Sequence, residues 1–337
     1  MYVITYKCLP PCAARFTRAD EYAATMRSRP DVLVLGGGGV LGEAWIMGVL
    51  AGVEDGAGID LRECEAFVGT SAGAIVSAHL AAGNSPRRPS SLSTEVSVVG
   101  ALGRPGAPGA VAGLATVAAG AARRAGSTAV AASAAFAPLA LGFAAPGGAL
   151  VRGLMLRGVR HPEDTLAALR QAVAASGAQF DGRLRVSAVD RQSGRRVMFG
   201  GPGAPPAEVA EAVEASCAVP WLFAPVQIGG RDYVDGGVWS PTNLDAAPVG
   251  RDTHVLCLNP TASLAASHPL LTMMRTVARS AASVEGLALR GRGARVRTIA
   301  PNAECAAAMG ANFMATEPRT RVLSAAYRQG LRIATAD

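Results

Sequence analysis

The sequence has little charge and almost no lysine. Asp, Glu, Lys and Arg make up 17% of its 337 residues, below the usual quarter, and Lys7 is the single lysine. The 32 basic and 25 acidic residues leave a formal charge of +7, which favours an anionic partner. The arginines form no run, however, and they do not alternate with aromatic residues. These absences argue against nucleic acid as the partner.

The sequence also lacks a cysteine pattern and a secretory signal. Its six cysteines are scattered, and neither His nor Cys lies close enough to Cys8 and Cys12 to complete a zinc site. No apolar signal core follows Lys7. We therefore expect reduced thiols in a cytoplasmic protein. Residues 1–30 resemble no folded element, so we expect a disordered extension there and a working start near Met26.

An uncharged stretch, residues 125–151, is long enough to span a bilayer. Pro138, Pro146 and the dominance of alanine disfavour a transmembrane helix. Three interpretations stay open for the wider segment 96–151: buried alanine-rich helices, a mobile apolar cap, or a helix on the bilayer surface. The last of these predicts peripheral contact with the inner membrane surface.

The first third of the chain repeats a strand, a glycine turn and a helix. Residues 31–35 and 66–68 are short apolar runs, as in strands buried on both faces of a parallel sheet. Glycines follow each run, then helical stretches at about 43–54 and up to about 82. Half of the chain is apolar, which supports a sizeable core. This order predicts an α/β fold, a three-layer sandwich with a mostly parallel central sheet.

Later parts of the chain predict further elements. We expect helices at 164–175 and 208–216, a hairpin of strands 184–189 and 197–199, strands at 226–228 and 255–258, and a helical remainder over 261–337.

Ser71 is the candidate nucleophile. It lies in a Gly-x-Ser-x-Gly pattern, Gly69 to Gly73, between a predicted strand and a predicted helix. Flanking glycines permit the sharp turn that lifts such a serine above the sheet, at a helix N-terminus that favours negative charge. In a chain with 40 glycines the pattern alone is weak, and its context strengthens it.

The glycine run at 36–42 has two interpretations. Residues 37–42 fit the GxGxxG pattern of a dinucleotide site. That site needs an acidic residue at the tip of the second strand, where this chain has Ser71 and its neighbours. The preferred interpretation is an oxyanion hole, in which consecutive backbone amides hold a developing negative charge beside Ser71.

A serine nucleophile needs a base, and the sequence leaves the choice open. His79 lies eight residues along the same predicted helix, too far to reach Ser71. His254 or His268 could complete a triad. The alternative is Asp235, in a turn before Gly236 and Gly237, acting directly if its surroundings raise its pKa. Its purely structural interpretation is a common turn residue.

These motifs together resemble the patatin-like phospholipase family. The resemblance rests on the glycine run at 36–42, the Ser71 motif, and Pro220 to Asp235 with its following glycines, and it covers residues 31 to 260. It implies a patatin-like catalytic domain over 31–260 with an insertion at about 96–151, and 261–337 as a helical part of the same domain.

The resemblance also implies a mechanism. Ser71 would be the nucleophile and Asp235 its base, with no histidine and no metal or organic cofactor. The amides of Gly37, Gly38 and Gly39 would hold the oxyanion. The implied substrate is a phospholipid or an acylglycerol, cleaved through an acyl-enzyme. The remaining motif glycines are Gly42, Gly69, Gly73, Gly236 and Gly237.

One position departs from the family, and two other functions remain. Many members carry Arg or Lys where this chain has Leu41, which bears on rate or head-group preference.

A non-catalytic lipid- or partner-binding protein on the same scaffold is one alternative function. A nicotinamide-dependent oxidoreductase is the other, and the misplaced ribose acid disfavours it.

Overall fold

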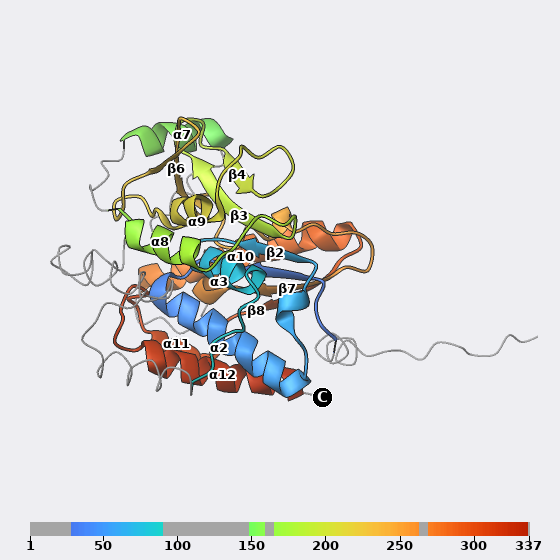
Figure 1. Ribbon diagram of the computed structural model, residues 1–337. Coiled ribbons are helices and arrows are strands. Elements are labelled where there is room, and N and C mark those ends of the chain that lie inside the picture. The colour runs from blue at the N-terminus through green and yellow to red at the C-terminus, as the bar shows by residue number, and fades with distance from the viewer. Residues whose placement is uncertain (1–27, 90–147, 159–164, 263–268, 336–337) are drawn as a thin grey trace, which may run out of the picture.

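The computed structural model describes residues 28–89, 148–158, 165–262 and 269–335 (Figure 1). One eight-stranded sheet lies between two layers of helices, which confirms the predicted three-layer α/β fold. Its strands are β1 (Val32–Leu35), β2 (Ala66–Gly69), β3 (Leu184–Asp190), β4 (Arg196–Phe199), β5 (Val226–Ile228), β6 (Arg231–Asp235), β7 (His254–Leu258) and β8 (Arg295–Ile299).

The sheet is mostly parallel, with an antiparallel end. Its order is β5-β6-β3-β2-β1-β7-β8, and β4 pairs with β3 off this path. The strands from β3 through β2, β1 and β7 to β8 run parallel. The pairs β3–β4, β3–β6 and β5–β6 are antiparallel. The β3–β4 pair is the hairpin predicted for 184–189 and 197–199. The parallel strands bring their carboxyl ends to one edge, where sites form in α/β proteins.

Helices cover both faces of this sheet (Figure 1). Alternate strand residues serve opposite faces: Leu33 and Leu35 pack in the larger apolar core, and Val32 and Val34 pack in a smaller one. The larger core also contains side chains of α2 (Gly39–Ala57), α3 (Ala72–Ala81), α8 (Ala167–Ala175), α9 (Val209–Cys217), α11 (Ala303–Met309) and α12 (Arg319–Thr335). The smaller core contains Leu289 of α10 (Pro269–Gly291).

Two boundaries differ from the predictions. Helix α2 begins at Gly39 instead of near residue 43, because the low helix propensity of glycine hides its first turn. The segment 261–337 is not wholly helical, since β8 adds an edge strand to the sheet. Arginines alternate with apolar residues in β8, and an edge strand with charged side chains is hard to distinguish from a polar helix in sequence.

The C-terminal helix α12 lies along α2 (Figure 1). The two backbones approach closely at Gly52 and Gly330. A β-carbon on Gly52 would lie 2.2 Å from the carbonyl oxygen of Tyr327, and one on Gly330 would lie 2.3 Å from that of Val49. The end of the chain therefore packs on the helix that continues from the glycine run.

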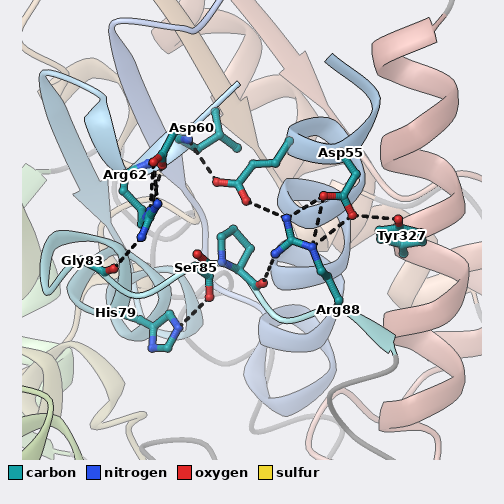
Figure 2. Close-up of polar contacts among 11 residues, drawn as sticks. Asp55, Asp60, Arg62, His79, Gly83, Ser85, Arg88 and Tyr327 are labelled. Atoms are coloured by element: carbon teal, nitrogen blue, oxygen red, sulfur yellow. Dashed lines mark hydrogen bonds and ion pairs between the residues drawn. The ribbon is translucent and has the colours of Figure 1, made fainter. Parts of the chain in front are cut away.

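The chain after α3 is tied to α2 by arginine (Figure 2). The Arg88 guanidinium donates to the Asp55 carboxylate at 2.6 Å and to Glu54 at 3.3 Å. The Tyr327 hydroxyl of α12 donates to the same Asp55 at 2.8 Å. Residues 1–27 of the expected extension 1–30 and residues 96–147 of the expected insertion lie outside the described residues. Residues 28–30 are described, and Arg29 forms an ion pair with Glu63. The last residues of the insertion form the start of α7 (Gly148–Gly158).

In the part of the chain that the structure describes, no helix is both long and apolar enough to span a bilayer.

Candidate active site

Ser71 occupies a strained turn between β2 and α3. Its φ of 51° and ψ of −118° are unusual for a residue with a side chain. A β-carbon on Gly69 would lie 2.5 Å from the Ala74 Cα, and one on Gly73 would lie 1.9 Å from the Leu35 carbonyl oxygen. Only glycine fits at either position, so the sequence pattern produces the sharp turn directly.

A second serine anchors this turn. The backbone N–H of Ser71 donates to the hydroxyl of Ser216 at 2.9 Å. Ser216 is fully buried in α9, an element far from α3 in sequence. Ser216 could not be predicted from the sequence, because only the packing of α9 against α3 brings it to Ser71.

Asp235 ends strand β6 and is only 2% exposed. Burial raises its pKa to about 7, although hydrogen bonds from the Gly237 N–H and the Ser71 side chain favour the ionised form. The Gly237 N–H donates to Asp235 Oδ1 at 2.6 Å. The Asp235 N–H donates to the carbonyl oxygen of Ala218 at 3.0 Å. The carboxylate is thus fixed, next to the Ser71 hydroxyl, and ready to titrate near neutral pH.

The pairing of strand β3 explains how two distant turns meet. Val186 of β3 pairs with Gly69 of β2, and Ala188 pairs with Asp235 of β6. Both β3 residues also pair with β4, which occupies the opposite edge. Strands β2 and β6 therefore share one edge of β3 and end two residues apart, pointing toward each other. This arrangement brings the elbow and the carboxylate together.

Asn243 links the two turns. It is fully buried with a left-handed backbone, φ 49°. Its Nδ2 lies 3.0 Å from the Thr70 hydroxyl, 3.2 Å from that of Ser187 and 3.2 Å from the Gly236 carbonyl oxygen. A fourth acceptor, the Ser240 carbonyl oxygen, lies at 2.8 Å. One amide thus holds the residue before Ser71 and the residue after Asp235.

The glycine run at 36–42 passes beside Ser71. A β-carbon on Gly37 would lie 3.4 Å from the Ser71 Cβ. The Gly37 N–H donates to the Pro241 carbonyl oxygen at 2.8 Å, so this amide already has an acceptor within the described fold. Among the described residues, no group accepts a hydrogen bond from the amides of Gly38 or Gly39.

Close packing holds these two amides in place. A β-carbon on Gly38 would lie 2.7 Å from the Pro260 Cβ. Gly39 has a φ of +60°, and a β-carbon there would lie 2.8 Å from the Phe313 carbonyl oxygen. Gly42 lies in the first turn of α2, and its N–H donates to the Gly38 carbonyl oxygen at 2.8 Å. The amides therefore lie at the N-terminus of a long helix, where negative charge is favoured.

These groups line one pocket, and its other side chains are mostly apolar. Cys217 lies beside Ser71. Burial raises the pKa of its thiol well above the usual range, with a further contribution from Asp235, so the thiol stays protonated. The pocket is lined by Ser71, Asp235, Gly37, Gly38, Gly39, Gly237, Cys217, Ala72, Ile75, Val219, Phe223, Pro241, Thr261 and Met314.

The described histidines lie away from the pocket. His254 is the first residue of β7, whereas the last, Leu258, accepts the Gly36 N–H beside the glycine run. His79 directs its ring toward the Ser85 carbonyl oxygen, 3.0 Å away (Figure 2). His161 and His268 lie outside the described residues. A triad through His254 is therefore excluded by position.

Two further observations describe the surroundings of the site. The Leu41 side chain is fully buried in the larger apolar core, so it does not face the pocket as a cation would. In the described ranges, no group of three or more His, Cys, Asp or Glu side chains could hold a metal ion.

Comparison with known proteins identifies similar sequences and folds. Residues 33–248 match the family model described as patatin-like phospholipase. No curated protein matches the chain. Among solved structures, VipD from Legionella pneumophila is similar over 91% of this chain and 67% of its own, with 15% sequence identity and a TM-score of 0.43.

Proposed function

Since the chain belongs to the patatin-like phospholipase family, we propose that it is a serine lipid acyl hydrolase that uses a Ser71–Asp235 dyad. Family membership supports lipid hydrolysis in general, and the dyad is the specific part of the proposal. The observation that carries it is the buried Asp235 carboxylate, hydrogen-bonded to the Ser71 side chain, with a pKa of about 7.

The dyad begins the reaction by a direct proton transfer. Ser71 Oγ attacks the ester carbonyl carbon while its proton passes to Asp235. A carboxylate with an ordinary pKa would be a weak base, and the raised pKa of Asp235 brings it near the working pH, where general bases are most effective. The bond from Gly237 keeps one carboxylate oxygen in place during this transfer.

The glycine run stabilises the charge that develops. As the carbonyl oxygen becomes an oxyanion, the amides of Gly38 and Gly39 donate to it. Each such donor contributes roughly 10²–10³ in rate in serine hydrolases. Collapse of the intermediate releases the alcohol, which takes the proton from Asp235. Water then attacks the acyl-enzyme, with Asp235 again as base, and frees Ser71.

The pocket chemistry supports a lipid ester as substrate. Ile75, Phe223 and Met314 present apolar side chains beside the reacting groups. An acyl chain of a phospholipid or acylglycerol can bury its methylenes there, at roughly 0.8 kcal/mol for each. No metal or organic cofactor enters any step of this mechanism.

Labelling with a fluorophosphonate tests the nucleophile and the base together. We expect the wild type to react, Ser71→Ala not to react, and Asp235→Asn to react at least a hundredfold more slowly. Ser77→Ala is the matched control, because Ser77 lies in the same helix and its buried hydroxyl has no partner among the described residues. Equal labelling of Ser71→Ala and the wild type contradicts the proposal.

A further inference from the structure

A tight turn beside the pocket contains Trp221 at a position whose backbone conformation favours glycine. The Leu222 N–H donates to the Val219 carbonyl oxygen at 3.1 Å, which closes a four-residue turn. Proline occupies its second position, and Trp221, in the third, has a φ of +68°. These are the features of a type II turn, whose third position favours glycine. The chain instead has its largest type of side chain there.

Contacts within the described fold do not compensate for the strained backbone of Trp221. Positive φ is disfavoured for a bulky side chain. Trp221 is 42% exposed, whereas Leu222 and Phe223 are 8% and 2% exposed. Among the described residues, no hydrogen bond, ring stacking or cation–π contact involves its indole. Strain that the interior does not explain indicates a role outside it.

Residues on either side of Trp221 reach the pocket, whereas Trp221 itself does not line it. Val219 and Phe223, on either side of the tip of the turn, both line the pocket that contains Ser71. The carbonyl oxygen of Ala218, one residue earlier, accepts the Asp235 N–H. The exposed indole is therefore the outward end of a segment whose inward residues would meet the substrate.

We propose that Trp221 binds the surface of the lipid aggregate from which the pocket takes its substrate. This inference rests on the proposed function and extends it to how the protein meets an insoluble substrate. Indole rings prefer the interface between water and lipid, because one part is apolar and the N–H bonds to water or head groups. The net charge of +7 favours an anionic surface.

Vesicle sedimentation tests the contact without turnover. The full chain carrying Ser71→Ala is mixed with vesicles of phosphatidylcholine and phosphatidylglycerol in equal parts. Adding Trp221→Asn should weaken binding about tenfold by removing exposed indole surface, and Trp221→Phe should retain most of it. Asparagine suits the comparison because it tolerates a positive φ, so the turn is retained. Leu287→Asn, an exposed apolar residue on α10 outside the pocket lining, is the matched control and should bind normally.

Hydrolysis of a soluble short-chain ester separates surface contact from pocket shape. With Ser71 present, Trp221→Asn should hydrolyse p-nitrophenyl butyrate within about twofold of the wild-type rate. An equal loss on vesicles and on the soluble ester overturns the inference, as does unchanged vesicle binding or an equal loss with Leu287→Asn. If the wild type hydrolyses neither substrate, the proposed function fails, while sedimentation still decides the role of Trp221.

Discussion

The buried Asp235 places activity and stability in opposition, which the variant Asp235→Asn can measure. Asparagine has nearly the same shape and still accepts the Gly237 N–H, whose bond to Asp235 is 2.6 Å long. It cannot ionise, and it cannot take the proton of Ser71. We expect the variant to lose activity and, above neutral pH, to be more stable than the wild type.

The sign and size of this effect follow from the pKa. The folded-state pKa of Asp235 is raised from 3.8 to about 7 by burial. Between these values the folded protein keeps a proton that the unfolded chain has released, so the wild type loses stability as the pH rises through this window. At about 1.4 kcal/mol per pKa unit, the full shift corresponds to about 4 kcal/mol. About 3 kcal/mol of this develops between about pH 5 and pH 7.

Guanidinium unfolding of both proteins from about pH 5 to about pH 8 measures this difference. The free energy of unfolding of Asp235→Asn minus that of the wild type should increase as the pH rises, and this difference should become constant above about pH 7. Asp232→Asn, on the same strand but partly exposed, is the control for removing one carboxylate from this strand. A difference that does not vary with pH would refute the reasoning, as would lower stability of Asp235→Asn at about pH 8.

Four further predictions concern the same site. The kcat/KM for p-nitrophenyl butyrate should fall about tenfold per unit below about pH 7, because protonated Asp235 is no base, and a flat profile contradicts this. Asn243→Ala should lower the free energy of unfolding, measured in urea, by about 2–4 kcal/mol and should reduce kcat, because it leaves buried acceptors unpaired. Asn302→Ala is the comparison: it removes only a helix cap and should lower the free energy of unfolding by about 1 kcal/mol. Gly38→Ala should slow fluorophosphonate labelling by about a hundredfold, because its β-carbon displaces Pro260, whereas Gly291→Ala, which meets open space at a position without positive φ, should label normally. His254→Ala should keep kcat/KM within about twofold, and a loss of several orders of magnitude contradicts the dyad.

Local patterns were enough to predict the central layer and the sharp turn at Ser71. Buried runs such as 66–68, followed by glycines and a helix, depend on neighbours in sequence, and the structure has those elements. The Ser71 turn is local too, because Gly69 and Gly73 meet atoms of adjacent elements. The sequence could also point to Asp235, since its turn carries its own glycines.

Features that depend on distant contacts could not be predicted in this way. No local signal indicates that Ser216 accepts the Ser71 N–H, or that Asn243 joins both turns. The engagement of the Gly37 amide depends on Pro241, about 200 residues later in the chain. The one sequence signal for Asn243 and Pro241 is that they lie in a polar turn with Ser and Thr, at 240–243. Such residues are common in turns without any catalytic role, so this signal does not distinguish them.

The packing of α12 has a practical consequence for anyone who shortens this protein. The family model ends at residue 248, and cutting the chain there would be a natural choice for a minimal enzyme. Yet the Phe313 carbonyl oxygen accepts the Leu41 N–H, and α12 lies along the helix that starts at Gly39. Such a truncation would remove Phe313 and α12, which pack against the start and the length of α2 and so hold the amides of Gly38 and Gly39 in place. Residues outside the recognised homology region thus belong to the smallest unit in which catalysis can be sought.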